Sequence, residues 1–193
     1  MSDFFDKETP WEIRNQILTY QTSSLMSDIE RAKFLKLPSG CRIRENAKII
    51  MQENLSIGEN CYIGEGAILD ASGKLKIGSN VSIGTNTFIA THDSSLLNIL
   101  GKNTREKSKS IKRSPVKIGS NTFIGSLSVI MPGVNIGKQC IIAPMSVVFE
   151  DIPDRTTYSP YKDMVDMLKE LSEKEKKLDD LLLKVQNLLK DQK

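Results

Sequence analysis

The chain has 193 residues, 39% of them hydrophobic and 26% charged, which fits one domain with appendages and excludes wholesale disorder. Its net charge of +3 is too small to indicate a nucleic-acid partner, and no apolar run reaches the ~18 residues that span a bilayer. Three cysteines cannot form a disulfide framework within one chain, and the single histidine, His92, excludes sites that need two or three imidazoles; we therefore expect a cytoplasmic protein with no resident metal.

Residues 1–36 form an N-terminal segment with the apolar spacing of helices. Apolar residues within 11–18 indicate one helix, and those within 25–34 indicate a second. Ser24 or Ser27 is suited to cap the second helix, because a hydroxyl at that position accepts a hydrogen bond from a free backbone N–H.

A hexapeptide repeat occupies residues 37–152. An aliphatic residue, usually followed by Gly, recurs every six positions, and these positions fall into groups of three. This pattern predicts a parallel β-helix of about five coils, in which each coil has three short strands, the aliphatic residues point inward and successive coils stack about 4.8 Å apart. The aliphatic positions are Leu37, Ile43 and Ile49; Ile57, Ile63 and Leu69; Ile77, Ile83 and Ile89; Ile118, Ile124 and Ile130; and Ile136, Ile142 and Val148.

Two other positions of the repeat have predictable roles. Gly and Asn, as in Gly84 and Asn86, suit the tight corners of the prism. The residue four places after an aliphatic position is usually small and is expected to face the interior as well. All three cysteines, Cys41, Cys61 and Cys140, occupy that small position. We therefore interpret them as small buried hydrophobes and not as catalytic or metal-binding thiols.

A long loop interrupts the repeat at residues 91–114. It is rich in Lys and Arg, and a long loop on a rigid scaffold is usually functional. His92 stands at its root, three places after Ile89 and therefore at a corner of the prism. On spacing alone, two interpretations of His92 are open: a functional group, or a solvated surface histidine.

Residues 153–193 are predicted to form a linker and a C-terminal helix. Apolar residues alternate there by four and three, which is the spacing of a heptad seam. Further apolar residues beside the seam favour a three-helix bundle over a dimer, and the alternative is a helix folded back on its own prism. The seam positions are Met164, Leu168, Leu171, Glu175, Leu178, Leu182, Val185 and Leu189, and the flanking residues are Met167, Leu181 and Leu188.

Over roughly residues 37–162, the chain resembles the hexapeptide-repeat acyltransferases, whose fold is a left-handed parallel β-helix. The resemblance is closest to the sugar and xenobiotic O-acetyltransferases of the maltose, galactoside, nodulation and polysaccharide types. A Thr-His pair, a long loop and a Pro-Val-x-Ile-Gly sequence carry most of its specificity. The resembling motifs are Thr91-His92, Pro115 to Gly119, Asn121 to Gly125, Val129 to Val134, Ser146 to Val148 and Asp151 to Pro153.

The resemblance implies acetyl transfer from acetyl-CoA to a hydroxyl of a sugar or polysaccharide, in a cleft between subunits of a homotrimer. His92 would be the general base, and the backbone N–H of Ser126 would stabilise the oxyanion. The pantetheine arm would pass small residues of neighbouring coils, and cations would contact the CoA phosphates. The implied CoA-binding residues are Gly125, Ser126, Ala143, Pro144, Lys162 and Arg113.

The chain also departs from the resembling enzymes. Phe123 replaces a common Trp, and Phe149-Glu150-Asp151 replaces a usual Thr-Lys-Asp near the expected CoA site. Gly64 and Ser72 stand where galactoside and maltose enzymes carry acceptor-binding Asn and Asp, so we do not expect a simple galactoside or maltose as the acceptor.

Three other functions occur on this scaffold. A γ-type carbonic anhydrase is excluded because its zinc needs three histidines. A nucleotide-amino-sugar N-acetyltransferase remains an alternative, although such enzymes often lack the loop histidine. A non-catalytic β-helix assembly subunit is the third possibility, in which the loop histidine would be surplus.

Overall fold

The structure is a computed structural model that describes residues 25–101 and 111–190; the side chains of 163–164 and 185–190 are not described. The helix predicted within residues 11–18 lies outside the described residues. The chain divides into two compact units, Met1–Tyr158 and Ser159–Lys193.

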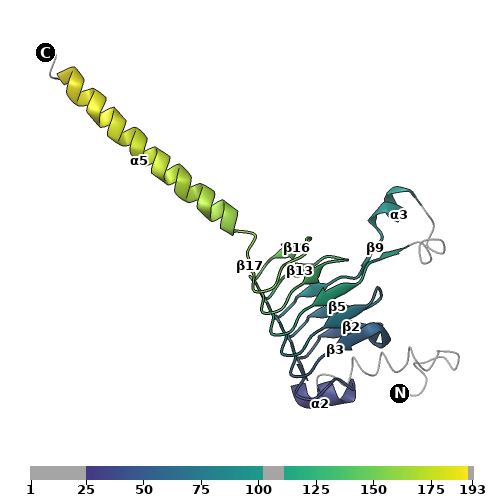
Figure 1. Cartoon of the computed structure of the whole chain (residues 1–193). Helices are drawn as coiled ribbons and strands as arrows, with labels where there is room; N and C mark the ends of the chain where they lie inside the picture. Colours follow the sequence, from purple (N-terminus) through teal and green to yellow (C-terminus); the bar gives the residue numbers. More distant parts are fainter. Residues whose placement is uncertain (1–24, 102–110, 191–193) are drawn as a thin grey trace. The chain divides into compact units, whose positions relative to one another are not determined.

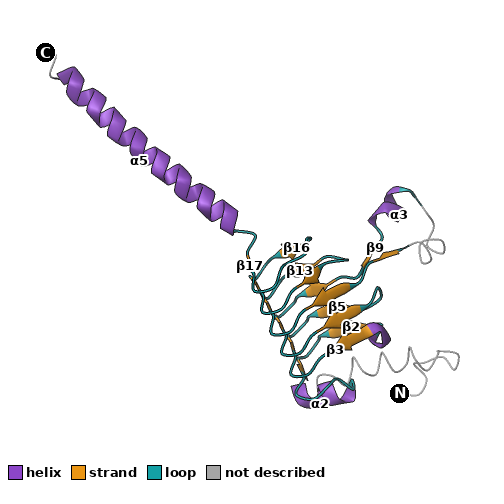
Figure 2. Cartoon of the chain, viewed as in Figure 1, coloured by secondary structure: helices purple, strands orange, loops and turns teal. Residues whose placement is uncertain are grey.

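The first unit is the predicted parallel β-helix, whose coils stack in chain order (Figures 1 and 2). Its three sides are parallel sheets that we call faces A, B and C. Face A contains β1 (Arg42–Ile43), β4 (Tyr62–Ile63), β7 (Ser82–Ile83), β12 (Phe123–Ile124), β15 (Ile141–Ile142) and β17 (Thr157–Tyr158). Face B contains β2 (Lys48–Ile50), β5 (Ile68–Asp70), β8 (Phe88–Ile89), β13 (Val129–Ile130) and β16 (Val147–Val148). Face C contains β3 (Leu55–Ile57), β6 (Leu75–Ile77), β11 (Val116–Ile118) and β14 (Asn135–Ile136).

The interior of the prism is built from the repeat positions that the sequence predicts. The aliphatic residues are buried, except for Leu37, Ile49 and Ile57, which are half-buried and pack against the core. Cys41, Cys61 and Cys140 are buried as well, which confirms their structural role. Burial raises the pKa of the Cys61 thiol to about 11, so this side chain remains a neutral thiol at physiological pH.

The corner residues have two different physical roles. Asn86 has a φ of +54°, in the left-handed region that Asn tolerates well, as expected for a tight corner. Gly84 is required for a different reason. A Cβ atom at Gly84 would lie 2.4 Å from the backbone N of Ser126 in the next coil, so the coils can stack only if this position lacks a side chain.

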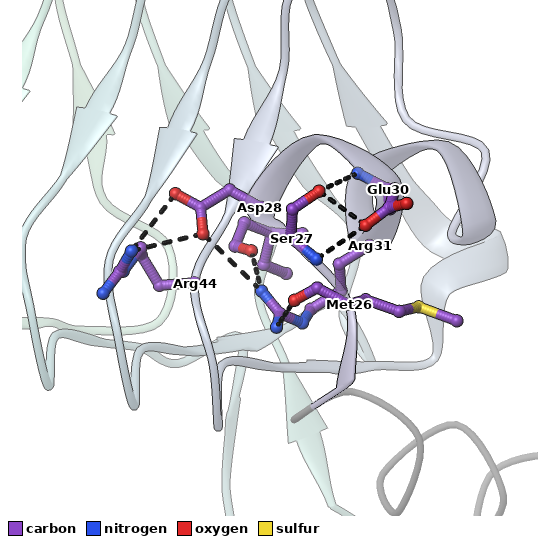
Figure 3. A network of polar contacts seen from close by, with 7 residues as sticks. Met26, Ser27, Asp28, Glu30, Arg31 and Arg44 are labelled. Carbon is purple, nitrogen blue, oxygen red and sulfur yellow. Dashed lines mark hydrogen bonds and ion pairs between the residues drawn. The ribbon is translucent and has the colours of Figure 1, made fainter.

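Helix α2 (Asp28–Phe34) covers the N-terminal end of the prism and packs against β1 (Figure 3). Of the two predicted capping residues, Ser27 is the N-cap, and it forms a capping box with Glu30. The buried guanidinium of Arg31 donates hydrogen bonds to the carbonyl oxygens of Ile43 (2.5 Å) and Met26 (2.6 Å). These bonds tie the helix to the first coil and satisfy carbonyl groups at the end of the core.

The prism continues beyond residue 152, where the sequence pattern predicts a linker. Ile152 bridges Ile136, and β17 pairs in parallel with β15 on face A. The residues between these contacts lack the Ile-Gly pair, and for that reason the last partial coil is not visible in the repeat.

The second unit is a single helix, α5 (Lys162–Lys190). Its described side chains are exposed, including large apolar ones such as Leu168 and Leu182. Within the described ranges, no helix is both long and apolar enough to cross a membrane.

Candidate functional site

The stacking of coils places an acidic residue beside His92. Leu69 of β5 pairs with Ile89 of β8, so the residues that follow these strands share one corner of the prism, between faces B and C. Asp70 ends β5 there, and Thr91 and His92 follow β8 one coil further on. A coil repeat of twenty residues, as in the pairing of 69 with 89, therefore brings together groups that are 22 positions apart.

The carboxylate of Asp70 is fully buried and accepts several hydrogen bonds. Oδ2 lies 2.7 Å from Nδ1 of His92 and accepts from the N–H (3.0 Å) and the Oγ1 hydroxyl (3.1 Å) of Thr91. Oδ1 accepts from the N–H of Ser72 at 2.9 Å. Ser72 Oγ also lies 3.2 Å from the same ring nitrogen of His92. The imidazole is thus anchored on one side and has 41% of its side chain exposed.

These contacts determine the protonation of the pair. Burial alone would raise the pKa of Asp70, but hydrogen bonds from the Thr91 N–H, from Ser72 and from His92 outweigh it and lower the pKa to about 2. An ionised carboxylate can only accept a hydrogen bond, so Nδ1 of a neutral His92 must carry the proton. Nε2 then has a free lone pair, which is the form that a general base requires.

The long loop leaves the prism at this corner through a short antiparallel hairpin (Figure 1). Strands β9 (His92–Asp93) and β10 (Lys112–Arg113) pair so that Arg113 lies opposite His92. Helix α3 (Ser95–Ile99) follows β9. Arg113, one of the residues expected to contact CoA phosphates, is therefore next to His92.

The other expected CoA-binding residues gather at the corner between faces A and B. Ile124 pairs with Ile142, so Gly125 and Ser126 stack on Ala143 and Pro144. A Cβ atom at Gly125 would lie 2.4 Å from the backbone N of Pro144, so the two coils can stack here only if this position lacks a side chain. The N–H groups of Gly125 and Leu127 donate to backbone oxygens, but that of Ser126 has no acceptor among the residues that the structure describes.

One chain does not bring His92 and Ser126 together. His92 follows β8 at the corner between faces B and C, whereas Ser126 stacks on the turn that precedes β8. A full side of the prism separates them, on the order of 20 Å for one hexapeptide of extended chain. Lys162 belongs to the second unit.

Two grooves lie along face C. One of about 540 Å³ is lined by Lys76, Lys117 and Asn135 among others, and a second adjoins it at Lys76 and Lys117. Neither groove includes His92 or Ser126. In the described part of the chain, no group of three or more His, Cys, Asp or Glu side chains is placed to hold a metal ion.

Asp70 is the site residue that sequence reasoning missed. The signal was present, because a carboxylate stands directly after the Leu69 position, where Ile50 and Ala90 stand in the neighbouring coils. Counting one coil forward from Asp70 leads to Ala90, two positions before His92.

Comparison with protein families supports the repeat assignment. A family described as bacterial transferase hexapeptide (six repeats) matches residues 115–150, and one described as hexapeptide repeat of succinyl-transferase matches residues 54–91. Galactoside O-acetyltransferase of Escherichia coli K12 is 51% identical over 39 residues, which is 20% of this chain and 19% of that protein. The matched segments thus span about a fifth of the curated relatives' length.

Solved structures extend the likeness over most of the chain. A maltose O-acetyltransferase from Clostridium difficile 630 has a TM-score of 0.61 and 28% identity, covering 75% of this chain and 79% of that one. A hexapeptide-repeat acetyltransferase from Vibrio cholerae has a TM-score of 0.63 and 24% identity over 75% and 82% of the two chains. The structure of that Vibrio protein with acetyl coenzyme A has a TM-score of 0.54 and 23% identity over 79% and 86%.

Proposed function

We propose that this chain, a member of the hexapeptide-repeat transferases, is an acetyl-CoA-dependent O-acetyltransferase that acts on a hydroxyl of a sugar or polysaccharide. The observation that carries the proposal is the pairing of an exposed imidazole with a buried, ionised carboxylate at the root of the long loop. A surface histidine without a function would not need a buried charge behind it, because a carboxylate is costly to bury.

The proposed reaction uses His92 as a general base and then as a general acid. Nε2 takes the proton of the acceptor hydroxyl while the hydroxyl oxygen bonds to the thioester carbonyl carbon. The tetrahedral intermediate collapses, the C–S bond breaks, and the CoA thiolate receives the same proton from the imidazolium. Asp70 holds the ring and stabilises its positive charge, and it keeps its own charge throughout.

The N–H of Ser126 is our candidate for oxyanion stabilisation. It is directed to no acceptor in the described chain, and a preorganised backbone donor suits the developing charge. Within a single chain, this N–H and His92 lie a full side of the prism apart. The proposed site therefore needs two copies of the chain. A homotrimer in which each cleft joins His92 of one copy to Ser126 of the next meets that requirement.

In the ring that we propose, each prism turns one corner to the threefold axis, and the two faces beside that corner meet the neighbours. The corners at the outer ends of an interface must be the one with Ser126, between faces A and B, and the one with His92, between faces B and C. Face A of one copy must therefore pack on face C of the next, and face B remains outside.

Face A would bring the exposed apolar side chains of Phe123 and Ile141 to this contact, and the grooves of face C that they would meet are lined by the side chains of Lys76, Lys117 and Asn135.

The corner between faces A and B is our candidate for the acetyl-CoA site, because Gly125 and Ser126 stack there on Ala143 and Pro144 of the next coil. Arg113 is a candidate for its phosphates because it lies opposite His92. Lys162 stays a candidate from the resemblance alone. Asp151, which matches the Asp of the usual Thr-Lys-Asp, accepts hydrogen bonds from the backbone and side chain of Asn135 and so joins two coils.

The experiment that tests the proposal is a thiol-release assay with acetyl-CoA against three acceptor panels: sugars and oligosaccharides, nucleotide amino sugars, and simple alcohols. We expect CoA release with an acceptor hydroxyl and an alkali-labile ester product, and loss of both in His92→Ala. Turnover of amino sugars alone would establish the N-acetyltransferase alternative. Acetyl-CoA binding without turnover of any panel would favour an assembly subunit.

A further inference from the structure

Helix α5 exposes an apolar stripe along its length. The described apolar side chains retain between 43% and 63% of their surface, and they are Val165, Met167, Leu168, Leu171, Leu178, Leu181, Leu182 and Leu183. A single helix in water gains little from its own hydrogen bonds, and a continuous apolar stripe of this kind marks a surface that another element covers.

The stripe has the periodicity of a coiled coil. Leu168 and Leu182 occupy the first position of a heptad (a), and Leu171 and Leu178 occupy the fourth (d). Met167 and Leu181 occupy the seventh (g) and widen the stripe on one side. Leu at the a positions together with apolar g positions is unlike a two-stranded coiled coil, which prefers β-branched residues at a and charges at g.

The charged residues beside the stripe distinguish parallel from antiparallel packing. In a parallel, in-register coiled coil, a g residue faces the e residue of the next heptad on the neighbouring helix. That rule pairs Lys174 at g with Asp179 at e, which carry opposite charges. In an antiparallel pair aligned on the same seam, Lys174 faces Leu181 and Asp179 faces Ser172, so neither charge is matched.

We propose that α5 is the interaction surface for two further copies of this chain, with which it forms a parallel, in-register, three-stranded coiled coil. Parallel pairing follows from the charge pattern and is independent of the enzyme's chemistry. The number of strands rests in part on the trimer of the proposed function, because any threefold ring of prisms supplies three α5 helices related by one axis.

The single polar residue of the seam fits an in-register assembly. Glu175 occupies an a position, so the three copies of this carboxylate meet at one layer of the bundle. Lys174 and Lys176 flank it and can supply positive charge from the same or a neighbouring helix. A polar a-position residue lowers stability but selects one register, because any shift would place it against leucines.

The test uses cross-linking of the full-length protein through an introduced cysteine. Leu168→Cys places a thiol near the start of the seam, where a parallel coiled coil brings identical positions together. An antiparallel pair would put residue 168 opposite residue 185, about 26 Å from its counterpart. Glu173→Cys, on the outer face of the same helix, is the matched control. The wild-type chain reports any background from its three cysteines, which are buried.

Oxidation followed by a non-reducing gel gives the result. With Leu168→Cys we expect covalent dimers, and the fraction of chains in dimers should level off near two thirds, because one disulfide joins only two of the three helices. Cross-linking no greater than with Glu173→Cys would overturn the parallel pairing, and nearly complete conversion to dimers would overturn the three-stranded number. Neither outcome depends on acetyl-CoA turnover, so failure of the proposed enzyme activity would be seen separately.

Discussion

The imidazole of His92 reaches solvent, whereas the carboxylate behind it does not. Asp70 is a positioning residue in this arrangement, because it acts on the acceptor only through the ring. Asp70→Asn should lower turnover by on the order of 10²–10⁴-fold, because a carboxamide can donate to Nδ1 and so favour the wrong tautomer. The KM for acetyl-CoA should change little.

The split between kcat and KM separates positioning from mere structural support. Because Asp70 acts only through the ring of His92 in the proposed reaction, Asp70→Asn should lower kcat and leave the KM values of both substrates nearly unchanged. Asp154→Asn is the matched control, since Asp154 also accepts a backbone N–H, from Lys138 at 2.8 Å, but at the corner between faces A and C. An Asp70→Asn enzyme whose KM rises as much as its kcat falls would contradict the positioning role.

The same carboxylate should make the fold sensitive to acid. The hydrogen bonds that lower its pKa from the usual 3.8 to about 2 stabilise the folded chain only while Asp70 is ionised. This stabilisation is complete above pH 4 and is lost as the pH falls toward 2, and it amounts to on the order of 2 kcal/mol. Urea unfolding at both pH values should show the difference between wild type and Asp70→Asn narrowing at pH 2; a constant difference would argue against an ionised Asp70.

The role of Ser126 can be tested by removing its backbone N–H. Ser126→Ala keeps the backbone N–H and should be mild, whereas Ser126→Pro removes it and should lower turnover by on the order of 10²-fold or more. The fold should tolerate the change, because Pro144 occupies the equivalent position one coil further on. Circular dichroism checks this, and a strong loss with Ala would instead indicate a role for the hydroxyl.

At the scale of elements, the proposed coiled coil of α5 can be tested by comparing Glu175, on the seam, with Glu173, on the outer face. Glu175→Leu should raise the free energy of unfolding of the coiled coil by on the order of 1–2 kcal/mol per chain, and with it the melting midpoint, because it replaces a charge at an a position by an apolar residue. Glu173→Leu makes the same chemical change on the outer face and should have little effect. Circular dichroism at 222 nm during heating measures both, and equal midpoints would place Glu175 outside the core.

The elements of the prism were largely predictable because their residues obey a strict local period. Most hexapeptides repeat an inward aliphatic residue and a small residue four places on, so the period predicts most of the buried positions. The sequence predicted Ser24 or Ser27 as the N-cap of α2. The structure identifies Ser27, because its side chain and backbone form reciprocal hydrogen bonds with Glu30. The last strand, β17, was missed because it lies beyond the final Ile-Gly pair.

The site was harder to predict because its groups meet by stacking and not by proximity in sequence. His92 could be identified from the loop and the motif around it, but its partner Asp70 lies one coil earlier. The resemblance implies roles for both His92 and Ser126 in one site. The structure places them at different corners of the prism, and the motifs do not predict that separation. Which residues meet at a corner depends on the number of residues in each coil, and local motifs do not contain that number.

At the scale of the whole molecule, the proposed ring predicts which faces of the prism are needed for assembly of the trimer. Ile141 on face A and Val147 on face B are equally prominent, with 50% and 48% of their surface exposed. Ile141→Asp should disrupt the trimer and its activity, because face A packs on a neighbour, whereas Val147→Asp should leave both intact. Light scattering and the thiol-release assay decide between the faces; loss of the trimer with Val147→Asp alone would refute the predicted ring.

The corner between faces B and C differs from the other two in a way that bears on how such proteins diversify. The turns there range from the short one between β13 and β14 to the long excursion between β8 and β11, yet β6 and β11 pair as regularly as β3 and β6. Added length at this corner costs the scaffold little, since the entropy of closing a loop grows slowly with its length. Because His92 stands at the same corner, evolution or an engineer can exchange the loop, and with it the surroundings of the proposed acceptor, while the stacked coils keep the pair of His92 and Asp70 in place.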